Sequence, residues 1–317
     1  MIMKKFTFFL TAALFCGSLA TFAQDDEEIS ITPSIDPDTF EPTFNISEKN
    51  DYYVIYMDEE TMSKISDGQL KYIGPEKKEG RNLWMWDGQS YFTESPSGNN
   101  SFDVPGAYMS YIVGGAGWSG IGYNVAKPDA NGEYEFQEAD GTKVKYPVVP
   151  LNLTGINDDY KFHFAVKAND KDAVDFYLTD GSGHEAHLVL GDTKYGTNEP
   201  VANFERDGEW YNIDVPMTYL EDNFGLSFKK DNAYVDKNIF CVLAGGNAGF
   251  TIDYDAVFFY GPKGTGTGIK DVTANRNHTV AEYYSIDGKK VSAATAKANK
   301  GIYIVKQDGK AKKIVID

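Results

Sequence analysis

The stretch IFCVLAGGNAGFTIDYDAVFFYG, residues 239–261, places two runs of aromatic and β-branched residues on either side of a glycine-rich turn. Such residues favour strands, whereas glycine and asparagine favour the turns between them. The same texture recurs over residues 51–262, where about eleven short apolar runs alternate with turn residues. Helical patterns are confined to residues 58–66 and 217–224. The sequence therefore predicts an all-β sandwich.

The start of the chain has the pattern of a secretory signal. Two lysines precede an apolar run over residues 6–20, and small residues follow as far as Ala23. This pattern predicts a signal peptide over residues 1–23, with an apolar run too short to span a membrane. Because no later stretch is long and apolar enough for a span, we expect an exported chain without a transmembrane segment.

Charge is distributed unevenly along the chain. The formal net charge is −17, whereas nine lysines and one arginine against five acidic residues give residues 268–317 a charge of +5. Without the two lysines of the signal peptide, residues 24–267 therefore carry −24. Such an acidic body repels nucleic acid and anionic membranes, so we expect neither as a partner. Neutral ligands or cations suit it, and solubility alone would also account for the charge.

Two segments flank the expected sandwich. Residues 24–50 are acidic, contain three prolines and predict a leader or linker, with one early strand at EISIT, residues 28–32. Residues 263–268 are rich in glycine and predict a linker to residues 269–317, where Asp-Gly turns separate short strands. The expected order is a signal peptide, a leader, a body over residues 51–262, a linker and a small C-terminal β domain.

The C-terminal domain resembles the sorting domains of the type IX secretion family. The resemblance lies in YSIDGKKV at residues 284–291, KGIYIVK at residues 300–306 and GKAKKIVI at residues 309–316. It implies a small β-sandwich recognised by the secretion machinery, and a product displayed at the outer surface of a Gram-negative bacterium. Because the tail is short for this family, both its activity as a signal and its removal stay open.

The body resembles a galactose-binding-like β-jelly roll, the fold of many carbohydrate-binding modules. FERDGEWYNIDVPMTYL at residues 204–220 is similar to a strand with a short helical turn, and GWSGIGYNV at residues 117–125 to an earlier strand. The positions that match the family pattern are Asp207, Gly208, Trp210, Ile213, Pro216, Ile252, Asp253, Asp255, Phe258 and Tyr260. The resemblance implies a jelly-roll sandwich, but the fold hosts binders of several kinds, so the function has to be argued from a site.

The strand candidate RNLWMWDGQSYF, residues 81–92, is apolar on both faces. Alternation puts Trp84 and Trp86 on one face and Leu83 and Met85 on the other. If the aliphatic pair fills the sandwich, the tryptophans lie on a free face, where flat rings can stack on sugar rings. If the tryptophans face inward, the site lies elsewhere. We favour the first arrangement, because two neighbouring tryptophans would overfill an interior layer.

Four further residues belong to the candidate sites. Tyr91 and Tyr108 are possible companions of the two tryptophans in binding a glycan. Asp253 and Asp255 share one face of the last strand, and the jelly-roll resemblance implies a structural calcium ion bound in part by Asp253. Because calcium takes six to eight oxygen ligands, an acidic sheet edge without a metal is the alternative.

Other residues are expected to be structural. Cys241 is the only cysteine after the signal peptide, and its apolar neighbours predict a buried free thiol. His163 alternates with polar and small residues, which predicts a surface position on a strand. Trp118 and Trp210 match core positions of the resembled fold and are expected to be buried.

Two patterns with catalytic or metal-binding associations are also present. Glu133, Glu135 and Glu138 resemble the spaced carboxylates of retaining β-glucanases, whose chemistry needs two carboxyl groups roughly 5 Å apart and one raised pKa. Turn residues flank this stretch, so we expect exposed strand ends without catalysis. His184 and His187 in HEAH are three positions apart, not the four of a zinc-protease helix, so no metal site is expected.

Three functions remain as hypotheses. The leading one is a non-catalytic protein that binds a polysaccharide or oligosaccharide by aromatic stacking and polar loop contacts. The second is a structural or adhesin-like surface protein without a sugar site, and the third is a glycoside hydrolase on a jelly roll. Binding to a panel of polysaccharides separates the first from the second, and released reducing ends would support the third.

Overall fold

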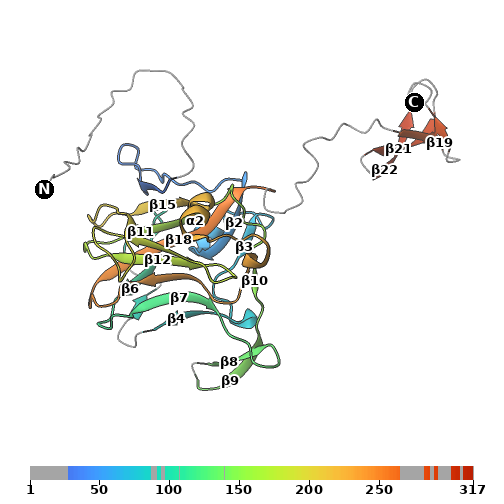
Figure 1. Ribbon diagram of the computed structural model, residues 1–317. Coiled ribbons are helices and arrows are strands. Elements are labelled where there is room, and N and C mark those ends of the chain that lie inside the picture. The colour runs from blue at the N-terminus through green and yellow to red at the C-terminus, as the bar shows by residue number, and fades with distance from the viewer. Residues whose placement is uncertain are drawn as a thin grey trace.

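The computed structural model describes residues 28–86, 91–93, 97–106, 108–138, 140–264, 282–285, 289–291, 301–307 and 310–316. Two packed sheets form the body, with short helices and hairpins at their margins (Figure 1). The prediction of an all-β sandwich is confirmed. Within these residues, no helix has the length and apolar character needed to cross a membrane.

The larger of the two sheets has eight strands. They are β1 (Ser30–Pro33), β2 (Asn50–Tyr56), β3 (Leu70–Tyr72), β5 (Tyr91–Thr93), β6 (Met109–Ile112), β11 (Lys161–Lys167), β15 (Tyr211–Pro216) and β18 (Thr251–Pro262). β18 is the central strand, pairing with β11 along one edge and with β6 and β2, end to end, along the other. β15 and β1 continue the sheet beyond β11.

The second sheet has six strands and runs in the order β14-β13-β12-β17-β7-β4. Its strands are β4 (Arg81–Met85), β7 (Gly120–Val125), β12 (Val174–Thr179), β13 (Glu185–Leu190), β14 (Pro200–Ala202) and β17 (Asn238–Leu243). Only β14 pairs in parallel in this sheet. β4 forms one edge, which becomes important for the site below.

Smaller elements lie outside the two sheets. They are α1 (Glu59–Met62), α2 (Met217–Phe224), the 3-10 turns η1 (Lys77–Glu79) and η2 (Lys230–Ala233), the hairpin β8 (Glu133–Gln137) and β9 (Lys143–Pro147), and the pair β10 (Leu151–Asn152) and β16 (Tyr234–Val235). α2 ends at Gly225, which adopts a left-handed φ of 70° that glycine tolerates best.

The alternation of β18 decides which side chains enter the core. Ile252 and Tyr254 pack between the sheets, whereas the intervening and following aspartates lie on the outer face. Ala256, with a φ of 54°, lies where the pairing with β11 shifts register, next to a shift in the pairing with β2 between Val257 and Phe258. Phe259 faces the core after this bulge, so one extra residue keeps the apolar side chains of both halves in the same layer.

The outer face of the eight-stranded sheet is apolar and is covered. Its buried residues include Tyr52, Val54, Ala165, Trp210 and Phe258. The cover comes from segments far apart in the sequence and supplies Phe44, Ile46, Met62, Ile65 and Phe102. This sheet is therefore buried on both faces, as strands with two apolar sides require.

Part of this cover is the stretch expected to be an acidic leader. The early strand predicted there is present as β1, which pairs with β15. Downstream of it, the Ser34 hydroxyl donates to Asn212 at 2.8 Å, and Asn212 donates to Thr43 at 3.1 Å. Residues 30–46 thus contribute a strand and a covering layer to the sandwich, which a linker would not do.

His163 lies under this cover, so its predicted surface position is wrong. Its side chain is fully buried, its ring stacks on Phe258 at 4.6 Å between centroids, and Phe44 lies 4.3 Å away on centroids. Its Nδ1 is 2.9 Å from Asp214 Oδ1. The predictions for two other residues are confirmed, since Trp210 is buried and Cys241 is a buried free thiol.

The described part of the tail is a four-stranded antiparallel sheet in the order β20-β19-β21-β22. Its strands are β19 (Glu282–Ser285), β20 (Lys290–Val291), β21 (Gly301–Gln307) and β22 (Lys310–Ile316). They agree with the expectation of short strands separated by Asp-Gly turns in this region. The predicted signal peptide over residues 1–23 and the part of the predicted linker beyond residue 264 lie outside the described residues.

Candidate binding face

The two faces of the edge strand β4 have different environments. Leu83 and Met85 pack against the core between the sheets. Trp84 and Trp86 therefore project from the opposite face of the strand, and 55% of the surface of Trp84 is exposed. Of the two arrangements considered from the sequence, the structure has the first: the aliphatic pair fills the sandwich and the tryptophans lie on the free face.

Two glycines of the neighbouring strand β7 make room for the second tryptophan. The Trp86 indole lies so close over Gly120 and Gly122 that a Cβ atom there would approach the ring to 3.0 Å and 2.6 Å, respectively. A larger residue at either position would push the indole away from the sheet. Trp86 is consequently half-buried against the strand, whereas Trp84 stands free.

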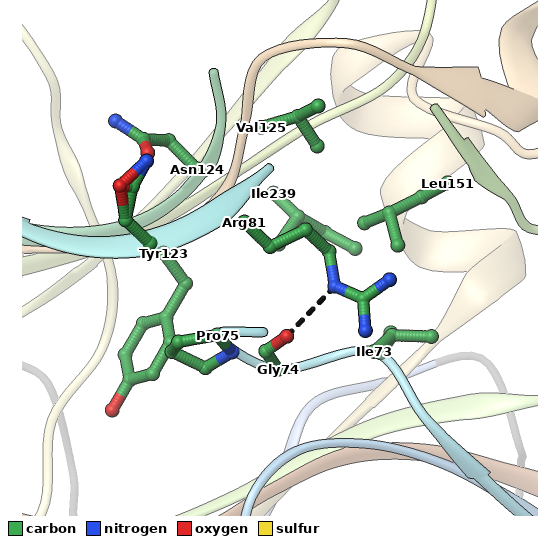
Figure 2. Close-up of a pocket in the computed structure, with 10 residues that line it drawn as sticks. Ile73, Gly74, Pro75, Arg81, Tyr123, Asn124, Val125, Leu151 and Ile239 are labelled. Atoms are coloured by element: carbon green, nitrogen blue, oxygen red, sulfur yellow. Dashed lines mark hydrogen bonds between the residues drawn. The ribbon is translucent and has the colours of Figure 1, made fainter. Parts of the chain in front are cut away.

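Arg81 fixes the beginning of β4 to the sandwich. Figure 2 shows its guanidinium in a small pocket whose apolar lining includes Ile73, Val125, Leu151 and Ile239. The Nε atom of Arg81 donates to the Gly74 carbonyl at 2.8 Å, and its Nη1 pairs with Glu79. The side chains fill this hollow themselves, so it positions the strand that carries the tryptophans and leaves no room for a ligand.

Trp118 is exposed, and the prediction that it is buried is wrong. Its exposed fraction is 64%, and it lies in the loop between β6 and β7, two residues before Gly120. Ser119 closes this loop by donating from its hydroxyl to the Ala116 carbonyl at 2.8 Å. The flanking glycines were the missed signal, because a tryptophan in a glycine-rich turn has few neighbouring side chains to cover it.

The two tyrosines expected to accompany the tryptophans do not both lie with them. Tyr108 is 2% exposed and belongs to the covered outer layer of the other sheet, where it packs edge-on against Trp210 at 5.1 Å between centroids. Its assignment to this site is wrong, because covering segments distant in sequence bury it. Tyr91 is in β5, and its side chain lies outside the described residues.

The far half of the same free face carries an imidazole–carboxylate pair. His187 Nδ1 lies 2.6 Å from Asp175 Oδ2, and its ring stacks on Tyr177 at 5.1 Å between centroids. The hydrogen bond to Asp175 raises the pKa of His187 above its ordinary value. Burial, together with the neighbouring thiol of Cys241, raises the pKa of the Tyr177 hydroxyl. Sequence reasoning missed this pair because Asp175 lies on the neighbouring strand.

His184 and His187 are each bonded to a different aspartate. His184 Nδ1 is held by Asp180 at 2.8 Å, and His187 is held by Asp175. Within the part of the chain that the structure describes, no three His, Cys, Asp or Glu side chains are grouped so that they could hold a metal ion. Each histidine therefore belongs to its own carboxylate.

Asp253 and Asp255, the expected calcium ligands, lie on the covered face of the eight-stranded sheet. Asp253 pairs with Lys167 at 3.1 Å, and Asp255 accepts a hydrogen bond from the Ser101 hydroxyl at 2.7 Å. One oxygen of each carboxylate is buried without a hydrogen-bond partner. Two carboxylates, one of them paired with an ammonium group, fall well short of the six to eight oxygens that calcium takes. The calcium ion stays a prediction.

The three glutamates that resemble a hydrolase site lie on the β8–β9 hairpin. Glu135 pairs with Lys143 at 2.6 Å, which lowers the pKa of its carboxyl group. Glu138 pairs with Lys77 at 3.2 Å. A general acid needs a raised pKa in a cleft beside a second carboxyl group, and lysine pairing at the surface has the opposite effect.

Comparisons with known proteins found similarity in structure only. No protein-family model matches the sequence, and no curated protein sequence matches it. A family 29 carbohydrate-binding module, a mutant of CBM29-2 complexed with cellulohexaose, is similar at 10% identity, with a TM-score of 0.30, 70% of this chain covered and 95% of that one. The family 11 module of Lic26A-Cel5E from Clostridium thermocellum gives 11% identity, a TM-score of 0.27 and coverage of 58% and 88%.

A third similar structure is the CBM22-1–GH10 portion of xylanase 10B from Clostridium thermocellum, complexed with xylohexaose. Its identity is 15% and its TM-score 0.29, with 68% of this chain and 29% of that chain covered. The similarity in all three cases is in fold, at low TM-score. The function proposed below therefore rests on the side chains of the free face.

We predict that Asp255 makes the protein less stable as the pH rises. Burial raises its pKa from 3.8 to about 7, so between these values the folded state keeps a proton that the unfolded state has released. The stabilisation that this retained proton gives to the folded state is complete below pH 3.8 and is lost as the pH rises through about 7. Asp255→Asn stays neutral and should remove this part of the pH dependence of the unfolding free energy.

Urea unfolding of both proteins at pH 5 and pH 8, with a chelator present, measures the difference. Equal pH dependence of the wild type and Asp255→Asn would contradict the prediction. Adding calcium tests the separate expectation of a metal: a higher midpoint that Asp253→Ala abolishes would support calcium, and an unchanged midpoint would count against it.

Proposed function

We propose that this chain is an exported, non-catalytic protein that binds a neutral polysaccharide or oligosaccharide on the free face of the six-stranded sheet. Trp84 carries this proposal. Trp84 is 55% exposed although its neighbours on the strand, Leu83 and Met85, pack against the core. An exposed aromatic surface held on a rigid sheet is a feature of interaction sites rather than of packing.

Stacking on sugar rings is the interaction that such a surface supports. Indole rings offer a large flat apolar face, and a sugar ring presents C–H groups on its flat faces while its hydroxyls stay in water. The Trp86 indole lies close to the glycines of β7, and Trp118 adds a second highly exposed tryptophan in the adjoining loop. The three tryptophans thus supply aromatic surface at one end of the sheet.

Charge favours a neutral glycan over an acidic one. The segment 24–267 carries a net charge of −24, which repels uronate or sulfate groups. The free face itself holds the carboxylates of Asp175 and Glu185, the latter with 54% of its side chain exposed. Hydroxyl groups can bond to the exposed Glu185 carboxylate, whereas a carboxylated sugar would be repelled.

We further propose that the protein acts outside the cell. The predicted signal peptide and the resemblance of the tail to type IX sorting domains support export to the outer surface of a Gram-negative bacterium. Antibody labelling of intact cells that produce the full chain, and of cells producing a chain truncated after residue 264, tests this. Surface labelling that depends on the tail is expected, and full-length protein retained inside the cell would contradict the proposal.

The decisive variant for glycan binding is Trp84→Ala. Loss of one stacking ring costs about 0.5–1.5 kcal/mol of binding free energy, so affinity for a bound polysaccharide should fall roughly twofold to tenfold. The melting temperature should stay near that of the wild type because the ring is already exposed. Affinity electrophoresis against a panel of neutral and acidic polysaccharides, with calorimetric melting curves, measures both quantities.

Trp210→Ala is the matched control, since this tryptophan is 7% exposed and donates from Nε1 to the Asn99 carbonyl at 2.9 Å. Its truncation should cost roughly 3–5 kcal/mol of stability. Retained polysaccharide affinity in Trp84→Ala would contradict the proposed site. No binding of the wild type to any glycan would favour an adhesin-like role, and released reducing ends would favour a hydrolase.

A further inference from the structure

A continuous row of paired residues joins Trp84 to the opposite half of the six-stranded sheet. Its register pairs are Trp84 with Gly122, Gly122 with Cys241, Cys241 with Tyr177, and Tyr177 with His187. Directly paired residues project to the same face of a sheet. Four strand spacings of about 4.8 Å separate the two ends of this row by roughly 19 Å.

The residues in the middle of the row are buried by other parts of the protein. Gly122 has no side chain and is covered by the Trp86 indole, and Cys241 is fully buried. The Tyr177 hydroxyl lies near the Cys241 thiol and the Asn238 side chain. The row therefore offers an exposed indole at one end and the half-buried ring of Tyr177, stacked on His187, at the other.

His187 is built to present one ring nitrogen outward. Its Nδ1 is held by the fully buried carboxylate of Asp175 at 2.6 Å, and 24% of its side chain is exposed. This bond places the proton on Nδ1 in the neutral ring, leaving Nε2 for other partners. Glu185 Oε2 lies 3.4 Å from Nε2, and the second oxygen of Asp175 has no hydrogen-bond partner.

We propose that His187, oriented by Asp175 and stacked on Tyr177, is a second contact of the glycan site, so that a linear neutral oligosaccharide lies across the strands from Trp84 to His187. This inference rests on the proposed function. A sugar ring at this end meets the edge of the imidazole and the Glu185 carboxylate, which both accept hydrogen bonds from its hydroxyls. A disaccharide on the tryptophans is too short to reach them.

Calorimetric titration of the full chain with β-1,4-linked gluco-, xylo- and manno-oligosaccharides of two and six units tests the inference. His187→Ala should lower the affinity for the bound hexasaccharide about twofold to tenfold, the range expected for a hydrogen bond, and leave the disaccharide unaffected. Trp84→Ala should weaken both. His184→Ala is the matched control, because His184 is also held by an aspartate, Asp180, but lies outside the row.

The outcomes separate the two proposals. If Trp84→Ala lowers the affinity for the hexasaccharide and His187→Ala does not, the proposal of a second contact at His187 is wrong. The proposed binding site at the tryptophans is then still supported. If Trp84→Ala keeps the hexasaccharide affinity, or the wild type binds none of the sugars, the proposed function itself fails. Should His187→Ala melt early, the imidazole NMR signals of the unmutated chain decide: hexasaccharide should shift those of His187 but not those of His184, and unshifted His187 signals overturn the inference.

Discussion

The structure depends on an asymmetry between its two sheets. The eight-stranded sheet is apolar on both faces and is covered on both, whereas the outer face of the six-stranded sheet is covered only in part: Asp175 and Cys241 are buried there, but Trp84 is exposed. A strand that is apolar on both sides has to be covered on both, by protein or by a ligand. β4 meets this condition only on the side of Leu83 and Met85, and its tryptophans stay in contact with water.

The covering of the outer face of the larger sheet and the exposure of part of the outer face of the smaller sheet have separate causes. Phe44 closes the larger sheet over His163, and loop residues such as Phe102 complete the layer. On the smaller sheet, Gly120 and Gly122 leave room for the Trp86 indole to lie close to the backbone of β7. The anchoring of β4 by Arg81 then gives the exposed indole a fixed position, which stacking on a ligand requires.

Local patterns in the sequence were sufficient for the strands and for the two faces of β4, because alternation acts over neighbouring residues. They were insufficient wherever burial depends on a distant segment. Tyr108 and His163 are buried by parts of the chain far from them in sequence, and His187 finds its carboxylate across a strand pair. The prediction that Trp118 is buried was wrong for another reason. It followed the resemblance to a family strand, although the glycines around Trp118 indicate a turn with few side chains to cover it.

The indole N–H signals of the four tryptophans test the central claim most directly, because each reports on one place in the fold. In a ¹⁵N-labelled chain titrated with a polysaccharide-derived oligosaccharide that it binds, the account predicts shifts for Trp84 and Trp86. It predicts no shift for Trp210, which is hydrogen-bonded to Asn99 on the covered sheet. Binding that shifts Trp210 and leaves Trp84 and Trp86 unchanged would contradict the account.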